Sequence, residues 1–147
     1  MYKVILVPLD GSVRAEAILP HVTNLARCYQ AKVVFVQVVE PEPLIIGPDV
    51  VYPMINQEMA EERTTAAQTY LADKKAEFSQ KEIAVETYVG HGPVVEEIIR
   101  YADRTKADLI AMASHGRTGL SRVFYGSVAA GVLNRVDRPL LLIRSSD

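Results

Sequence analysis

Five short apolar runs recur along the chain, separated by segments in which apolar residues return at helical spacing. The runs cover residues 4–9, 33–39, 83–89, 109–113 and 140–143. The second run is almost continuously apolar, which is typical of a strand buried on both faces of a parallel sheet. The third run alternates apolar and polar residues, which predicts a half-exposed strand at a sheet edge. The pattern therefore predicts five strands.

Each predicted strand except the last is followed by a predicted helix. The helical segments cover residues 12–29, 55–78, 93–102 and 127–136. Pro20 lies inside the first segment and predicts a kink, because proline removes a backbone hydrogen-bond donor. Four of the eight prolines fall within residues 40–53, which argues against regular structure there. The alternation of strands and helices predicts one α/β domain over residues 1–147, an open parallel sheet with helices on both faces.

The composition supports this fold class and excludes several others. A length of 147 residues suits one domain, and 49% hydrophobic with 23% charged residues is typical of a soluble globular protein. The net charge of −2 argues against nucleic-acid binding and against a polybasic membrane surface. No apolar run approaches the ~20 residues of a membrane span, and no signal peptide is visible. We therefore expect a cytoplasmic protein without a disulfide or a zinc site, since Cys28 is the only cysteine.

Candidate chemistry collects at the carboxyl ends of the predicted strands, where open α/β sheets bind their ligands. Asp10 follows the first strand, Val38 to Glu40 lie at the end of the second, and a glycine-bearing loop follows the fourth. Gly126 and Ser127 then open a helix, whose first turn presents unpaired N–H groups and a partial positive charge suited to phosphate. The same residues can equally serve only to shape a loop and to cap a helix. The chain has neither a Walker motif nor a dinucleotide fingerprint.

Three segments of the chain resemble the universal stress protein family, and the resemblance covers the whole chain. They are residues 7–12, residues 107–110, and residues 114–120 continued through Gly126-Ser127. The family's nucleotide signature is G-x2-G-x9-G-[ST], and Gly116, the next nine residues, Gly126 and Ser127 match its last three elements. Ala113 occupies the first glycine position. Its methyl group is a problem if the backbone there needs a positive φ, whereas in strand geometry alanine supplies the same backbone N–H.

The resemblance implies a five-stranded parallel sheet of strand order 3-2-1-4-5, a homodimer, and binding of ATP with Mg²⁺. Carried over by position, the residues that would flank adenine and ribose are Pro8, Asp10, Val38, Met112 and Ala113. Those that would hold the phosphates are Gly116, Gly126, Ser127 and Val128. These assignments are expectations from the family.

Three functions are compatible with these residues. The first is an ATP-binding module of stress response or signalling, and the second is a dimeric interaction protein that does not bind nucleotide. The third is a slow ATP hydrolase, for which the sequence offers no general base or carboxylate cluster, so no catalytic residue is assigned.

The last predicted strand is apolar at every position. It consists of Leu140, Leu141, Leu142 and Ile143. The family's strand order places it at a sheet edge, and an uninterrupted apolar edge favours pairing with another chain. We therefore expect these residues to pair with their own copy across a two-fold axis.

Overall fold

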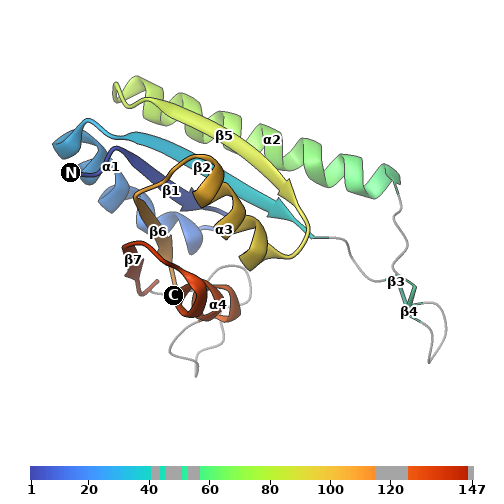
Figure 1. The fold of residues 1–147 in the computed structure, drawn as a ribbon. Helices are drawn as coiled ribbons and strands as arrows, with labels where there is room; N and C mark the ends of the chain where they lie inside the picture. Colours follow the sequence, from blue (N-terminus) through green and yellow to red (C-terminus); the bar gives the residue numbers. More distant parts are fainter. Residues whose placement is uncertain (41–43, 46–50, 53–56, 115–125, 146–147) are drawn as a thin grey trace.

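The computed structural model describes residues 1–40, 44–45, 51–52, 57–114 and 126–145, and five parallel strands form its main sheet (Figure 1). The strands are β1 (Val4–Pro8), β2 (Lys32–Val39), β5 (Val85–His91), β6 (Leu109–Ala113) and β7 (Leu140–Ile143). Their spatial order is β5-β2-β1-β6-β7, which counted along the chain is the order 3-2-1-4-5 that the family resemblance implied. The direction of winding reverses between β1 and β6, so this point is the topological switch of the sheet.

Helices cover both faces of the sheet, as the alternation of elements predicted. The helices are α1 (Leu19–Tyr29), α2 (Gln57–Gln80), α3 (Val94–Arg104) and α4 (Ser127–Arg135), and a short 3₁₀ helix, η1 (Ala15–Ile18), precedes α1. Figure 1 shows α1 and α2 on one face of the sheet and α3 and α4 on the other. Each face therefore has its own layer of packed side chains.

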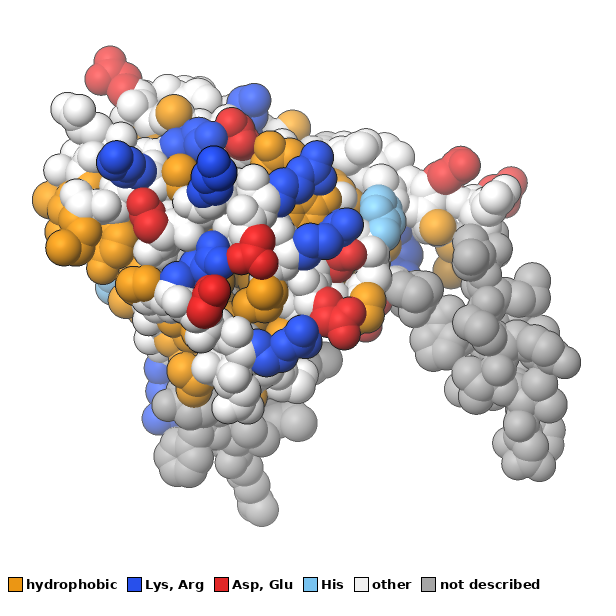
Figure 2. All heavy atoms as spheres, in the orientation of Figure 1, with side chains coloured by type: hydrophobic (Ala, Val, Ile, Leu, Met, Phe, Trp, Pro, Cys, Tyr) orange, Lys and Arg blue, Asp and Glu red, His pale blue; other side chains and the backbone are white. Residues whose placement is uncertain are grey.

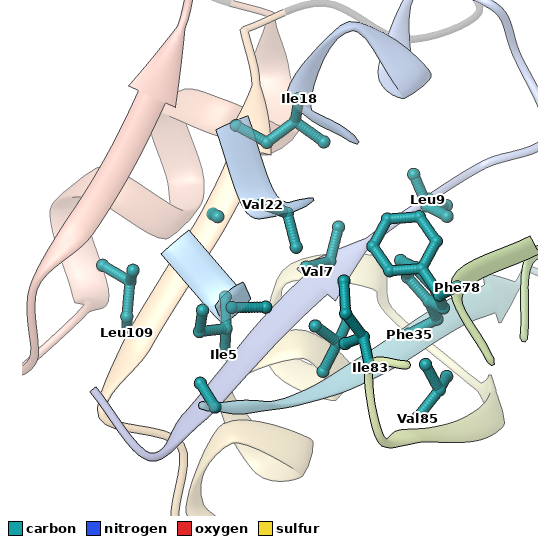
Figure 3. Close-up of a cluster of buried hydrophobic side chains, with 14 of the residues drawn as sticks. Ile5, Val7, Leu9, Ile18, Val22, Phe35, Phe78, Ile83, Val85 and Leu109 are labelled. Atoms are coloured by element: carbon teal, nitrogen blue, oxygen red, sulfur yellow. The ribbon is translucent and has the colours of Figure 1, made fainter. Parts of the chain in front are cut away.

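The core is divided by the alternation of side chains along each strand. On β1, Ile5 and Val7 face α1 and α2, whereas Leu6 faces α3 and α4. The first of these layers is drawn in Figure 3, where side chains from η1, α1, α2 and four strands meet. At its centre the rings of Phe35 on β2 and Phe78 on α2 meet edge to face, with 5.0 Å between their centroids. This contact anchors the carboxyl-terminal part of α2 on the sheet.

Two local expectations from proline are corrected by the structure. Pro20 is the second residue of α1, where a backbone N–H has no partner within the helix, so it begins the α-helix and does not kink one. The proline-rich segment contains two short antiparallel strands, β3 (Leu44–Ile45) and β4 (Val51–Tyr52). Regular pairing is possible because none of the four prolines lies within either strand.

Two charged side chains join the elements at the amino ends of the strands. The carboxylate of Asp108 accepts the backbone N–H groups of Lys3 and Val4, at 2.8 and 3.2 Å, and so fixes the start of β1 beside β6. Arg138 donates to the carbonyl oxygens of Ala102 and Ala107, at 2.8 and 2.9 Å, and also pairs with Asp103. It thereby ties the turn before β7 to the end of α3.

We expect the substitution Phe78→Ala to lower the free energy of unfolding by about 3–5 kcal/mol, because it leaves a cavity against the buried ring of Phe35. The Phe78 side chain is 1% exposed, so the cavity would be enclosed by protein and would not open to water. Chemical denaturation of the two proteins measures the difference. An effect below about 1 kcal/mol would show that α2 does not pack on the sheet through this contact.

Candidate functional site

The candidate site lies where β1 and β6 separate at the carboxyl end of the sheet. Backbone pairing between the two strands covers only Ile5 with Leu109 and Leu6 with Ile110, although β6 continues to Ala113. On its other side β1 stays paired with β2 as far as Pro8. An unpaired carboxyl end at the switch point is the position in which open α/β sheets bind ligands.

A tight turn around Asp10 forms one wall of this position. The backbone N–H of Leu9 still bonds to the Val36 carbonyl at 2.9 Å, and Gly11 then takes a positive φ of 85° that favours glycine. Asp10 Oδ1 accepts the backbone N–H of Ser12 at 2.9 Å and its hydroxyl at 2.6 Å. Ser12 Oγ in turn accepts the N–H of Ala15 at 3.2 Å. The half-buried Asp10 carboxylate is therefore held in a fixed orientation at the end of β1.

The start of α4 lies beside the end of β6 and is the second part of the candidate site. The backbone N–H of Ser114 bonds to the Ile143 carbonyl at 2.7 Å, and the N–H of Gly126 bonds to the Ser114 carbonyl at 2.8 Å. These bonds fix the first turn of α4 directly beside the end of β6. Gly126 is the extended residue before the helix, and within the described part of the chain no side chain caps its first turn. This turn consequently offers N–H groups and a partial positive charge to an anion.

The structure brings most of the predicted nucleotide-binding residues to this end of the sheet. Pro8 ends β1, Val38 lies one residue before the end of β2, and Met112 and Ala113 end β6. Ser127 and Val128 lie in the first turn of α4, after Gly126. Gly116 falls in residues 115–125, outside the described residues.

Alanine at position 113 is compatible with the backbone of this structure. Ala113 is the last residue of β6 and is 7% exposed. Among the described residues other than glycine, a positive φ occurs at Gln30, Glu82 and Lys106, and not at Ala113. The strand geometry therefore does not require glycine here.

Sequence analysis missed a polar cluster beside the Asp10 turn. Glu16 of η1 accepts a hydrogen bond from Lys74 Nζ at 2.6 Å through Oε1, and one from the Tyr70 hydroxyl at 2.8 Å through Oε2. Tyr70 and Lys74 are one helical turn apart on α2, so their spacing was a possible signal. The sequence holds no sign that Glu16, 54 residues before Tyr70, lies opposite them.

The cluster shifts the pKa values of its basic and phenolic members. Burial and the hydrogen bond to Glu16 raise the pKa of the Tyr70 hydroxyl far above its usual value, and the negative charge of Asp10 contributes. Burial alone lowers the pKa of Lys74, but its bonds to Glu16 and the nearby charge of Glu77 outweigh burial and raise it. Both groups therefore keep their protons throughout the neutral range.

A second polar region lies at the end of the edge strand β5. A shallow recess of about 500 Å³ is lined by Ala60, Glu61, Thr64, Thr65 and His91. The Thr64 hydroxyl donates to the Ala60 carbonyl at 2.8 Å, and it is hydrogen-bonded to His91 Nε2 at 2.9 Å. Among the residues that the structure describes, no three His, Cys, Asp or Glu side chains are grouped to hold a metal ion.

The face of the molecule that carries α3 mixes charges of both signs (Figure 2). In Figure 2, Lys and Arg side chains alternate with Asp and Glu over the face that carries α3. Arg104 lies 5.8 Å from the ring centres of Tyr88 and Tyr101. None of the described helices is long and apolar enough to cross a membrane.

The strand order and the open switch point define a doubly wound α/β protein. The chain matches the universal stress protein family over residues 1–144 and belongs to that family. Universal stress protein MJ0531 of Methanocaldococcus jannaschii is 31% identical over 145 residues, which cover 98% of this chain and 83% of the relative.

Solved structures agree with this membership. The structure of MJ0577, also from Methanocaldococcus jannaschii, has a TM-score of 0.85 at 27% identity and covers 100% of this chain and 99% of that chain. Two more distant universal stress proteins share the fold. One, in complex with cAMP, has a TM-score of 0.62 at 20% identity and covers 99% and 98% of the two chains. The other, from Archaeoglobus fulgidus in complex with dAMP, has a TM-score of 0.66 at 18% identity and covers 97% and 98%.

Proposed function

We propose that this universal stress protein binds ATP at the switch point and acts in the cytoplasm as a stress-response or signalling module. The observation that carries the proposal is the first turn of α4, which follows the extended Gly126 and is fixed beside the end of β6 by the bond to Ser114. A helix start without a side-chain cap supplies several N–H donors to a phosphate and no negative charge that would repel it. In this proposal Gly126, Ser127 and Val128, together with Gly116, hold the phosphates.

We assign the adenosine part of the ligand to the carboxyl ends of β1, β2 and β6. Pro8, Asp10 and Val38 would flank adenine and ribose, and Met112 and Ala113 would line the ribose. Asp10 suits a ligand hydroxyl because a carboxylate held by the Ser12 bonds is already oriented. The complexes of other family members with cAMP and dAMP support an adenine nucleotide as the ligand class.

Mg²⁺ fits this site as an ion carried by the nucleotide. Mg²⁺ is usually bound through phosphates and retained waters with one or two carboxylates. Asp10 is the carboxylate at this end of β1, and the described residues hold no cluster of three acidic or other metal ligands. The ion would thus neutralise phosphate charge, while the protein supplies N–H donors.

ATP with Mg²⁺ should stabilise the folded protein, because a ligand that binds only the native state adds RT ln(1 + [L]/Kd). At a hundredfold excess over Kd this amounts to ~2.7 kcal/mol. Thermal unfolding with and without millimolar Mg-ATP measures the shift, and chromatography after denaturation shows whether the purified protein already carries nucleotide. If Mg-ATP causes no shift and no nucleotide is released, ATP binding is contradicted, and the alternative of an interaction module without nucleotide is favoured.

Ser127→Ala should weaken ATP about 10- to 100-fold and adenosine much less, because a hydrogen bond to a charged group contributes roughly 1.5–3 kcal/mol. Titration calorimetry with the two ligands measures both affinities. Ser79→Ala is the matched control, since Ser79 is an exposed serine near the end of α2. Equal weakening of ATP and adenosine would show that Ser127 acts through the fold.

We further propose that β7 forms a homodimer interface with its own copy. The strand is the edge of the sheet beyond β6, and each of its residues is partly exposed although all four are apolar. The two faces of the strand already contact the two core layers, so its outer backbone edge is the part left for pairing. A two-fold axis beside the strand would close the assembly.

Leu141→Lys should convert the dimer to a folded monomer, because it places a charge beside the pairing edge. Sedimentation at micromolar concentration gives the mass, and circular dichroism reports the fold. Met59→Lys, which changes an apolar residue 45% exposed on α2, should leave the dimer intact. A monomeric wild type, or a Leu141→Lys variant that remains a folded dimer, would contradict an interface on β7.

A further inference from the structure

The Glu16 clamp, formed by Glu16 of η1 with Tyr70 and Lys74 of α2, lies directly after the Asp10 turn in the chain. We propose that Glu16 is a positioning residue that orients Asp10 for the nucleotide, and that the clamp couples α2 energetically to nucleotide binding. This inference rests on the proposed function and assigns to it a control element outside the ligand contacts. The residues of the clamp reach the ligand only through the turn.

Hydrogen bonds join the turn to Ala15, and the peptide bond from Ala15 to Glu16 connects them to the clamp. Asp10 Oδ1 accepts both the backbone N–H and the hydroxyl of Ser12, and Ser12 Oγ accepts the N–H of Ala15. Ala15 is the first residue of η1 and is 7% exposed, and Glu16 follows it. A movement of Glu16 therefore displaces the group that supports Ser12, and Ser12 supports the Asp10 carboxylate.

The clamp holds η1 on α2 through both oxygens of one carboxylate. The Lys74 ammonium and the Tyr70 hydroxyl each donate to a different oxygen of Glu16, at 2.6 and 2.8 Å. The side chains of Lys74 and Glu16 are 13% and 25% exposed, so solvent screens their attraction less than that of a surface pair. Lys74 Nζ also lies 5.5 Å from the centre of the Tyr70 ring. Two partners at once leave the carboxylate little freedom to rotate.

α2 packs on the sheet through its carboxyl-terminal part, and the clamp meets the helix there. Its buried side chains are Ala67, Leu71 and Phe78, and between Gln57 and Ala66 no side chain is buried. Tyr70 and Lys74 lie within the packed part, next to Leu71. A ligand that restrains Asp10 should therefore restrain this part of α2, and by linkage the integrity of the clamp should change ligand affinity to the same extent.

The chain contains a chemically matched cluster that does not touch the Asp10 turn. Glu86 of β5 accepts from Lys32 Nζ at 2.8 Å and from the Tyr88 hydroxyl at 3.0 Å, the same three residue types in the same roles. It joins the first residue of β2 to β5, at the amino end of the sheet. Changes there control for loss of a lysine–glutamate–tyrosine cluster as such.

The test compares Glu16→Gln with Glu86→Gln by titration of ATP, adenosine and inorganic tripolyphosphate. Glutamine keeps the size of the side chain and removes the charge that both donors share. We expect Glu16→Gln to weaken ATP and adenosine by the same factor, about 3- to 10-fold, which is roughly 0.7–1.4 kcal/mol of binding free energy. Tripolyphosphate, which does not reach Asp10, should bind unchanged, and Glu86→Gln should change none of the three affinities.

A second readout follows the coupling itself. In the wild type and in Glu86→Gln, saturating ATP should slow amide hydrogen exchange in residues 67–78 of α2, and in Glu16→Gln, also saturated with ATP, this protection should be smaller. The variant Tyr70→Phe removes one of the two donors to Glu16, while Lys74 still binds it. This variant should therefore lose less adenosine affinity than Glu16→Gln, and it tests the clamp even if Glu16→Gln does not fold. Tyr88→Phe is its control.

The outcomes separate this inference from the proposed function. A wild type that binds neither ATP nor adenosine overturns nucleotide binding and the positioning role together. A wild type that binds both, with Glu16→Gln and Tyr70→Phe binding equally well, overturns the positioning role alone. Weakening of tripolyphosphate by the same factor as ATP would show that Glu16 acts on the whole fold, and would also overturn it.

Discussion

The structure depends on the position of β1 at the centre of the sheet, paired in parallel with β2 on one side and with β6 on the other. Ile5, Leu6 and Val7 are completely buried, so the strand contributes to both core layers. Parallel neighbours need crossover connections, and these place one pair of helices on each face. Asp108 fixes the start of the strand by accepting two of the first backbone N–H groups.

The same arrangement creates the candidate site. Because the chain winds away from β1 in both directions, the carboxyl ends of β1 and β6 are not paired with each other beyond Leu6 and Ile110. The Asp10 turn follows β1 and carries a carboxylate, and the first turn of α4 lies beside the end of β6 and offers backbone N–H groups. The carboxylate suits a hydroxyl-bearing group of a ligand, and the N–H groups suit an anionic group. An adenine nucleotide carries both groups, so it suits the proposed site.

The support of the site extends farther from the ligand than its contact residues. Glu16 follows Ala15, whose N–H bonds to Ser12, and Ser12 bonds to Asp10. Glu16 is joined to α2 through Tyr70 and Lys74. Burial raises the energetic consequence of such bonds, since a charged group taken from water needs its partners. The helix that packs on one face of the sheet is thereby part of the structure that holds the ligand-facing turn.

The sequence by itself determined the elements and the family. Apolar periodicity located all five strands of the main sheet and the four helices, and the resemblance of the Asp10 turn and of the Gly116, Gly126 and Ser127 spacing to the family implied a nucleotide site. These features are local, since strand and helix periods and glycine spacings are properties of neighbouring residues. Only the tertiary structure decided that Pro20 starts a helix, that Ala113 needs no positive φ, and that Glu16 meets Tyr70 and Lys74. The contacts of Glu16 join residues more than fifty positions apart. The packing of whole helices on the sheet decides which residues meet, and no local sequence pattern contains this information.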